Sequence, residues 1–249
     1  MIGINLLGLL VLVLFVVLLI VFIAIGDRWP VSFRKIRGYE ALLKALERAV
    51  ESGERVHLSL GTGSLIGTDS AAAFAGLVVL TEIAKVTSLS DRPVVVSTGD
   101  GAMAIVAQDT LRSAYREAGA LDRYEPISAR MLGPTPFSYA ANIPILLESE
   151  RVSANVLLGA FGAEGALAAD FGERKQTFVM AGTEDIQSQA LLYAVAEYPL
   201  IGEEVFAGGA YLDVSPAHRA SLRVQDTVRF IIVGGILIGL LLNLLGISL

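Results

Sequence analysis

The chain has 249 residues, of which 54% are hydrophobic and 18% charged, and its formal net charge is −6. It contains no cysteine, which excludes disulfides, thiolate metal sites and cysteine nucleophiles. The acidic balance argues against nucleic acid as a partner, because nucleic-acid-binding proteins gather Lys and Arg on one surface. A mean hydropathy of +0.64 is too high for an ordinary soluble domain, and the apolar excess lies at the two ends of the chain.

Residues 1–26 are predicted to form a transmembrane helix. The run from Leu6 to Ile25 carries no charge and is long enough to cross a hydrocarbon core of about 30 Å. A cleaved signal peptide is the weaker interpretation, because no basic region precedes this run and no A-x-A site follows it.

Residues 27–54 are predicted to hold a juxtamembrane segment and one amphipathic helix. Apolar residues such as Leu42 and Leu46 recur at helical spacing over residues 39–52. Gly53 follows as a candidate C-cap, since glycine readily takes the left-handed conformation that ends many helices.

Residues 55–214 repeat one pattern: a short apolar run, a glycine and a helical segment. The glycines that end the apolar runs are Gly61, Gly99, Gly133, Gly159 and Gly182. Strands that alternate with helices indicate a parallel sheet, and near-continuous apolar runs are typical of strands covered on both faces. We therefore predict a Rossmann-like α/β domain with a five-stranded parallel sheet flanked by helices, and a possible sixth edge element within 197–214.

Ligands of such sheets bind outside the carboxyl ends of the strands, where the strand order reverses. If the order is 3-2-1-4-5, the loops after the first and fourth strands flank this crevice. The candidate cofactor-binding residues in these loops are Gly61, Thr62, Gly63, Ser64, Gly67, Gly159 and Gly162. A phosphate could bind there at a helix N-terminus. The alternative, which we favour, is that glycine only makes the tight turn, since every unit has one. The sequence requires no cofactor.

Acidic residues begin several of the predicted helices, namely Asp100, Glu164, Glu184 and Asp185. Acids at this position satisfy the helix dipole and would repel a bound phosphate. A Mg²⁺ or Ca²⁺ site built from Asp100, Glu184 and Asp185 is a weaker alternative, because the assumed strand order does not place their loops together. His57 lies inside the first strand and is expected to be a hydrogen-bonded core residue, so a catalytic triad has little support.

Two predicted helices, residues 71–80 and 137–147, are apolar on nearly every side. The outer helices of a doubly wound sheet normally keep one polar face. A helix without one is either central in a large core or buried against another subunit. We expect both helices to lie at a protomer interface.

Residues 215–249 are predicted to form one long helix that continues into a second transmembrane segment. Ser215 and Pro216 give a helix start, and residues 228–249 carry one charge at their inner edge. Gly235, Gly239 and Asn243 recur every four residues and so share one face, where another transmembrane helix could pack closely.

Basic residues flank both apolar segments only on the side of the middle domain. They are Arg28, Arg34, Lys35, Arg37, Arg219, Arg223 and Arg229. By the positive-inside rule, the middle domain faces the cytoplasm and both termini lie outside. The expected location is a bacterial inner membrane.

The segments GTGSLIGTDSAAAFAG, VSTGDGAMAIVAQDTLR and MAGTEDIQSQALL are similar to a bacterial family of membrane-anchored proteins defined as a domain of unknown function. The resemblance covers most of the middle domain and implies no catalytic residues. The leading hypothesis is a self-associating membrane scaffold or accessory subunit without catalytic activity, with a second copy or another membrane subunit as its partner. The alternative is a membrane-anchored sensor that binds a nucleotide or another small ligand at the glycine loops.

Overall fold

A computed structural model describes residues 6–26, 33–67 and 70–245 of the protein. These residues belong to two compact units. One is the α/β domain, Arg34–Val214, and the other combines the terminal segments Met1–Phe33 and Ser215–Leu249.

The α/β domain is built on one parallel sheet. Its strands are β1 (Arg55–Gly61), β2 (Val95–Thr98), β3 (Ala129–Met131), β4 (Val152–Ala160), β5 (Phe178–Gly182) and β6 (Tyr198–Leu200). Their order is β3-β2-β1-β4-β5-β6 and every neighbouring pair is parallel. The predicted parallel α/β fold is therefore confirmed. The sheet has six strands and not five, because the possible edge element is a short strand that pairs with β5.

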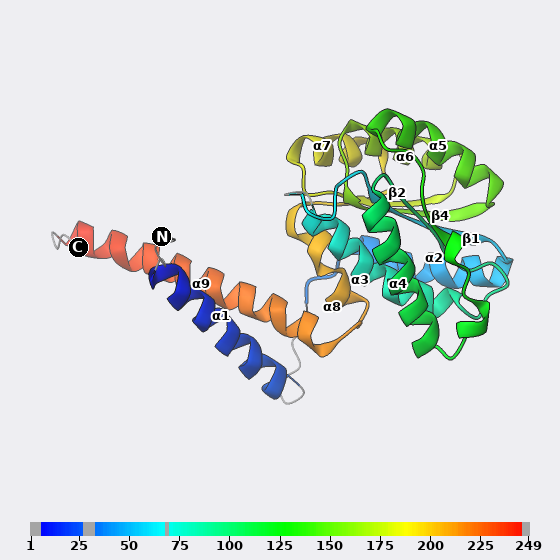
Figure 1. The fold of residues 1–249 in the computed structure, drawn as a ribbon. Coiled ribbons are helices and arrows are strands. Elements are labelled where there is room, and N and C mark those ends of the chain that lie inside the picture. The colour runs from blue at the N-terminus through cyan, green and yellow to red at the C-terminus, as the bar shows by residue number, and fades with distance from the viewer. Residues whose placement is uncertain (1–5, 27–32, 68–69, 246–249) are drawn as a thin grey trace, which may run out of the picture. The chain divides into compact units, whose positions relative to one another are not determined.

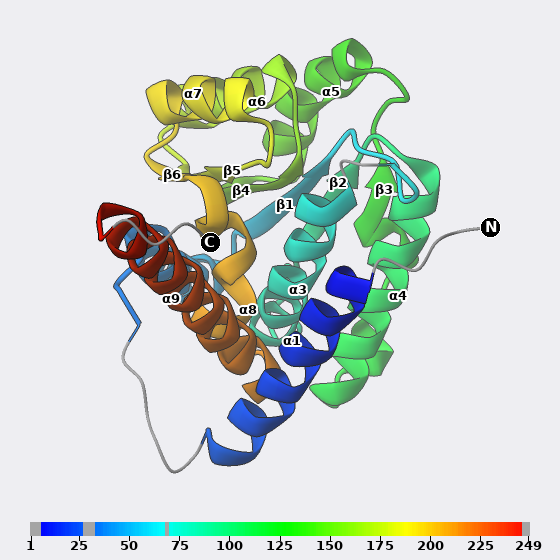
Figure 2. The ribbon, with the colours of Figure 1, turned by 90° about the vertical axis from the view of Figure 1, so that its left-hand side faces the viewer.

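Helices cover both faces of this sheet (Figures 1 and 2). One face carries α2 (Arg37–Ser52), α3 (Ser70–Thr87), α4 (Gly101–Glu117), the 3-10 helix η3 (Gly202–Ala207) and α8 (Gly208–Tyr211). The other carries α5 (Pro136–Ser149), α6 (Ala163–Arg174) and α7 (Ile186–Val195). Short 3-10 helices, η1 (Leu121–Arg123) and η2 (Pro126–Ser128), lie between α4 and β3.

The apolar helix α3 is buried within the chain. It packs on β1 and β4 and touches α2, α4, η3 and α8. Gly76 brings it so close to β4 that a Cβ there would lie 2.2 Å from the carbonyl oxygen of Leu158. The surrounding elements account for its lack of a polar face, so α3 gives no support to the expected protomer interface. The α5 helix differs, because Phe137 is 84% and Ile145 64% exposed.

The second unit contains two long apolar helices, α1 (Leu6–Ile25) and α9 (Pro216–Leu244), which contact each other and run in opposite directions (Figure 1). In the structure a single helix runs without a break from Pro216 to Leu244. By length and composition three described helices could cross a membrane, not the two predicted: the third is α3. Half of α3 is buried in the domain, whereas the apolar windows of α1 and α9 are 0% buried.

Candidate functional site

The strand order reverses between β1 and β4, and the backbones of these strands meet closely where they end. The Thr62 N–H donates to the carbonyl oxygen of Ala160 at 2.9 Å. Gly61 has a φ of +77°, and a Cβ there would lie 2.0 Å from the same oxygen. A Cβ at Gly159 would lie 2.1 Å from the carbonyl oxygen of Leu60. Gly61 and Gly159 are thus required by the contact between the two strands, whatever binds beside it.

A hollow of about 340 Å³ lies at this end of the sheet. It is lined by Thr62, Gly63, Ala160, Phe161, Gly162, Thr183, Glu184 and Asp185. Of the predicted site residues, the structure therefore brings together Thr62, Gly63 and Gly162. Ser64 and Gly67 are exposed and joined by a turn, in which the Gly67 N–H donates to the Ser64 carbonyl oxygen at 3.2 Å.

The loop after β5 completes the hollow, although it was not among the predicted ligand-binding loops. Thr183 is buried there, and its hydroxyl accepts from the Phe161 N–H at 3.1 Å and lies 3.3 Å from the Phe161 carbonyl oxygen. The signal that could have found this loop is the assumed strand order itself, which places β5 directly beside β4.

Glu164 joins two of the three loops. Its Oε1 accepts hydrogen bonds from the Thr62 hydroxyl and from the Gly162 N–H, both at 2.9 Å. Only 9% of Glu164 is exposed. The negative charge of this carboxylate adds to that of Glu184 and Asp185, and the residues that line the hollow include no Lys or Arg.

Two of the four acidic residues predicted at helix starts, Asp100 and Asp185, cap α4 and α7, whereas Glu164 lies in the first turn of α6 and Glu184 caps no helix. The Asp100 carboxylate accepts from the Met103 N–H at 2.8 Å, and Asp185 accepts from the Ser188 N–H at 2.7 Å. Hydrogen bonds from the side chain and the backbone N–H of Ser188 hold the pKa of Asp185 below its ordinary value. The alternative Mg²⁺ or Ca²⁺ site would need Asp100, which follows β2, to lie beside Glu184 and Asp185, which follow β5. The strands β1 and β4 lie between β2 and β5, so these residues are not brought together. The described residues contain no group of three or more His, Asp or Glu side chains that could hold a metal ion.

A chain of buried polar side chains crosses the sheet and joins it to α5. Its members are Asn155 on β4, His57 and Ser59 on β1, Ser97 on β2 and Tyr139 on α5, all 0% exposed. His57 Nδ1 lies 2.7 Å from Asn155 Oδ1, and Nε2 lies 2.8 Å from the Ser97 hydroxyl. The Tyr139 hydroxyl bonds to Ser97 at 2.9 Å and also to Ser59. The prediction of a hydrogen-bonded core histidine is confirmed.

A single assignment of donors and acceptors satisfies all of these buried polar side chains. The Asn155 amide donates to the Ala168 carbonyl oxygen, so its Oδ1 accepts from His57 Nδ1. Nε2 then accepts from Ser97, which leaves neutral His57 fully bonded. Burial, offset in part by Asn155 and reinforced by Arg130, lowers the pKa of His57 to about 4. Burial likewise raises the pKa of Tyr139 to about 12.

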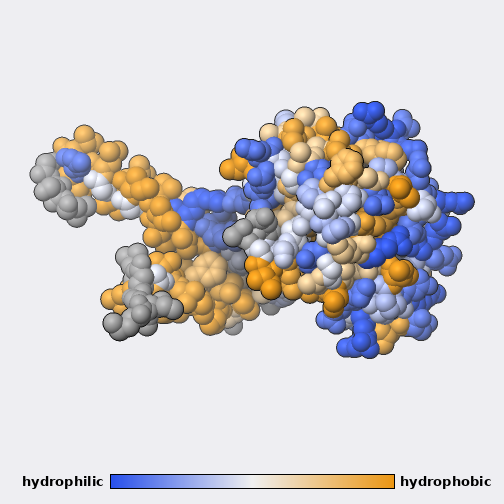
Figure 3. Space-filling model, turned by 45° about the horizontal axis from the view of Figure 1, so that its top comes forward, coloured by the Kyte–Doolittle hydropathy of each residue, from blue (hydrophilic) through white to orange (hydrophobic). Residues whose placement is uncertain are grey.

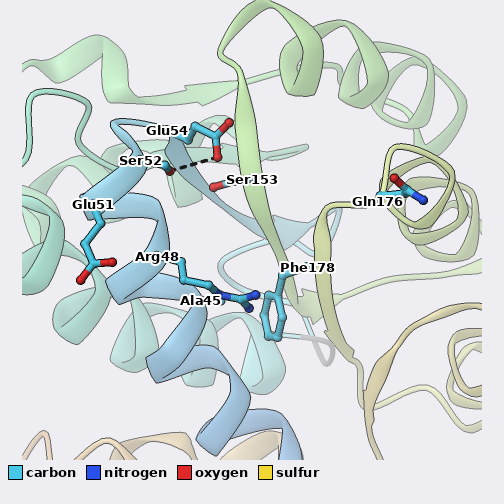
Figure 4. A pocket seen from close by; sticks show the side chains of 8 residues that line it. All are labelled: Ala45, Arg48, Glu51, Ser52, Glu54, Ser153, Gln176 and Phe178. Atoms are coloured by element: carbon cyan, nitrogen blue, oxygen red, sulfur yellow. Dashed lines mark hydrogen bonds between the residues drawn. The ribbon is translucent and has the colours of Figure 1, made fainter.

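A second hollow, of about 570 Å³, lies at the opposite end of the sheet between α2 and the starts of β4 and β5 (Figure 4). It is lined by Ala45, Arg48, Glu51, Ser52, Glu54, Ser153, Gln176 and Phe178. Ser52 donates to the Glu54 carboxylate at 3.1 Å, and the charges in the hollow are mixed. Ligands of parallel sheets bind at the carboxyl ends of strands, so the hollow beside Thr62 is the better candidate site.

The predicted helix-packing residues lie on α9. A Cβ at Gly235 or Gly239 would meet nothing within 4 Å, and Asn243 is exposed. In the described part of the chain this face of α9 is therefore uncovered.

Fold and hollow together define the class of protein: a parallel α/β domain with the strand order of doubly wound nucleotide-binding folds, on a chain that also carries two long apolar helices. The chain belongs to the family described as Domain of unknown function (DUF6754), whose model matches residues 2–249. Comparisons with curated proteins and with solved structures give no match.

Proposed function

We propose that this protein is a membrane-anchored scaffold or accessory subunit without catalytic activity, whose α/β domain associates with a second copy of the chain. The helices α1 and α9 serve as the anchors. Both are long and apolar enough to cross a bilayer, and the apolar window of each is 0% buried. The α3 helix belongs to the domain, because the sheet and its neighbouring helices cover it.

The proposed orientation places the domain in the cytoplasm and both termini outside a bacterial inner membrane. Among the described residues, Arg34, Lys35 and Arg37 follow α1, and Arg219 and Arg223 lie in the first turns of α9. Arg28, which belongs to the same basic group, lies outside the described residues.

The observation that supports self-association most strongly is the set of exposed apolar side chains on α5, α6 and α7. Its large side chains are Phe137 (84% exposed), Ile145 (64%), Leu167 (63%), Ile186 (81%) and Tyr193 (68%). The three helices are neighbours in the order α5, α6, α7. Figure 3 brings this side of the domain forward and shows hydrophobic residues among paler ones. Large exposed apolar side chains on three neighbouring helices favour an interaction site on this face.

The charges around this surface favour a second protein copy over a lipid surface. A domain that docks on anionic headgroups carries clustered Lys and Arg. Across α5, α6 and α7 the one basic residue is Arg174, at the end of α6, and it is paired with Asp170 at 2.8 Å. A surface whose large exposed side chains are apolar can pair with itself about a twofold axis, which is the commonest symmetry of soluble oligomers.

The test replaces Phe137 by Glu in the full chain. Burying one phenylalanine contributes about 1.5–3 kcal/mol, so Phe137→Glu should weaken association about tenfold or more. Ile105→Glu is the matched control, because Ile105 is 67% exposed but lies on α4, on the other face of the sheet.

Sedimentation velocity in mild detergent gives the association constants of all three proteins. We expect the Ile105→Glu protein to associate like the wild type and the Phe137→Glu protein to dissociate. A monomeric wild type, or equal association of the two variants, would contradict the proposal.

A second candidate function is ligand sensing, and the hollow beside Thr62 and Gly63 is the observation that favours it. It lies where ligands of doubly wound folds bind. In this case the domain would bind a nucleotide or another small ligand there while α1 and α9 hold it at the membrane.

A further inference from the structure

Three of the five large apolar side chains of the proposed interaction surface lie on α5 and α6, namely Phe137, Ile145 and Leu167. The core of a protein interface packs as closely as a protein interior. The two helices must therefore keep a fixed position relative to each other if this surface is to fit a second copy of the chain.

The buried polar network, which consists of Asn155, His57, Ser97, Ser59 and Tyr139, reaches the inner side of both helices. At one end, the Tyr139 hydroxyl on α5 bonds to Ser97 on β2 at 2.9 Å and to Ser59 on β1. At the other end, the Asn155 amide on β4 donates to the carbonyl oxygen of Ala168 on α6 at 3.3 Å. His57 joins the two ends, because it bonds to Asn155 at 2.7 Å and to Ser97 at 2.8 Å.

Both ends of the network lie next to exposed residues of the proposed surface. On α5, Tyr139 comes two positions after Phe137. On α6, Ala168 directly follows Leu167. A shift of either helix at its bond to the network would therefore move a side chain of the surface.

The network is closed to water. Its five side chains are 0% exposed, so water cannot replace a hydrogen bond that is lost. A Cβ at Gly172 on α6 would lie 3.1 Å from Asn155 Nδ2, so glycine there allows the helix to approach the amide closely. Because the members bond one to the next, removing one of them also changes the bonding of its neighbours.

We propose that the buried polar network is a positioning device for self-association. It holds α5 and α6 on the sheet in one arrangement and so sets where Phe137, Ile145 and Leu167 stand in the interface. Tyr139 and Asn155 are its positioning residues, since they make the bonds to the two helices. This inference rests on the proposed self-association and names residues that act on the interface without lying in it.

The test variant is Tyr139→Phe, which removes the hydroxyl and keeps the ring. Its matched control is Tyr39→Phe. Tyr39 is 1% exposed and its hydroxyl donates to the Glu204 carbonyl oxygen at 2.8 Å, but it lies on α2, on the other face of the sheet. Sedimentation velocity of the full chain in mild detergent should show association weakened about fivefold by Tyr139→Phe, the equivalent of one hydrogen bond of about 1 kcal/mol. The Tyr39→Phe protein should associate like the wild type.

Hydrogen exchange tests the network itself. Each tyrosine change is made in the Phe137→Glu protein, so that loss of association does not contribute to the result. In this background Tyr139→Phe should speed the exchange of backbone amides about fivefold in α6 as well as in α5. Tyr39→Phe should leave both helices unchanged. If Tyr139→Phe does not fold, Ser59→Ala replaces it with the same expected results, because it removes a bond of the same hydroxyl from the β1 side.

The outcomes separate this inference from the proposed function. A monomeric wild type would overturn self-association and, with it, the role of the network. An associating wild type whose Tyr139→Phe variant associates equally well would overturn the role of the network alone. Faster exchange confined to α5 would show that the network does not join the two helices and would also overturn the inference.

Discussion

Acid should destabilise the α/β domain through His57. This side chain is 0% exposed and its pKa is lowered to about 4 in the folded protein, whereas an unfolded histidine titrates near 6.5. Above pH 6.5 His57 is neutral in the folded and the unfolded state, so its ionisation takes nothing from the free energy of unfolding. As the pH falls from 6.5 towards 4, the unfolded chain takes up a proton that the folded domain does not, so the stability falls.

The two pKa values fix the size of the effect. One pKa unit corresponds to 1.36 kcal/mol, so the full difference between 6.5 and about 4 is about 3 kcal/mol, most of which is lost by about pH 4.5. Burial is the main cause, because it disfavours the charged imidazolium, and a protonated Nε2 would in addition have to donate. The Ser97 hydroxyl, which donates to Nε2 in the neutral chain, would then lose its acceptor.

Urea unfolding of the full chain, followed by circular dichroism at several pH values, measures this loss. Carboxylates also titrate in this range, so the variant His57→Gln serves as the reference. Gln keeps a donor and an acceptor for Asn155 and Ser97 but does not ionise. We expect the wild type to lose about 2–3 kcal/mol more than the variant between about pH 7 and about pH 4.5. Equal losses in the two proteins would refute the assignment of a neutral, fully bonded His57.

Two further predictions concern the backbone and the membrane. Gly61→Ala should destabilise the domain by several times the cost of Gly53→Ala, as measured by urea unfolding. Both glycines have positive φ, +77° and +67°, but an added Cβ meets the β4 backbone at Gly61 and open space at Gly53. The chain has no cysteine, so Ser215→Cys and Leu245→Cys each introduce a unique label. In intact cells an impermeant maleimide should modify the cysteine at 245 and leave the one at 215 unmodified, and the reverse pattern would contradict the proposed orientation.

The repeated strand, glycine and helix pattern was sufficient to predict the parallel α/β fold, because it is local. Gly61 and Gly182 do end strands, and Asp100 does cap a helix. The strand β6 was predicted only as a possible edge element, because it has just three residues and Pro199 is the middle one. Proline within a strand is tolerated only at the edge of a sheet.

Contacts between distant segments could not be read from the sequence. The apolar pattern of α3 is the same whether its outer side meets another subunit or the helices α2, α4 and α8. The bond between Thr62 and Glu164 joins residues 102 positions apart, and no local spacing signals it. The same applies to the loop of Thr183, which enters the site only through the strand order.

Native mass spectrometry of the full chain, extracted in mild detergent, tests the central claim most directly. It reports the number of copies, any co-purifying subunit and any retained small molecule in one measurement. The proposed scaffold predicts a closed homo-oligomer without a nucleotide-sized adduct. A monomer that carries such an adduct would contradict the proposed self-associating scaffold.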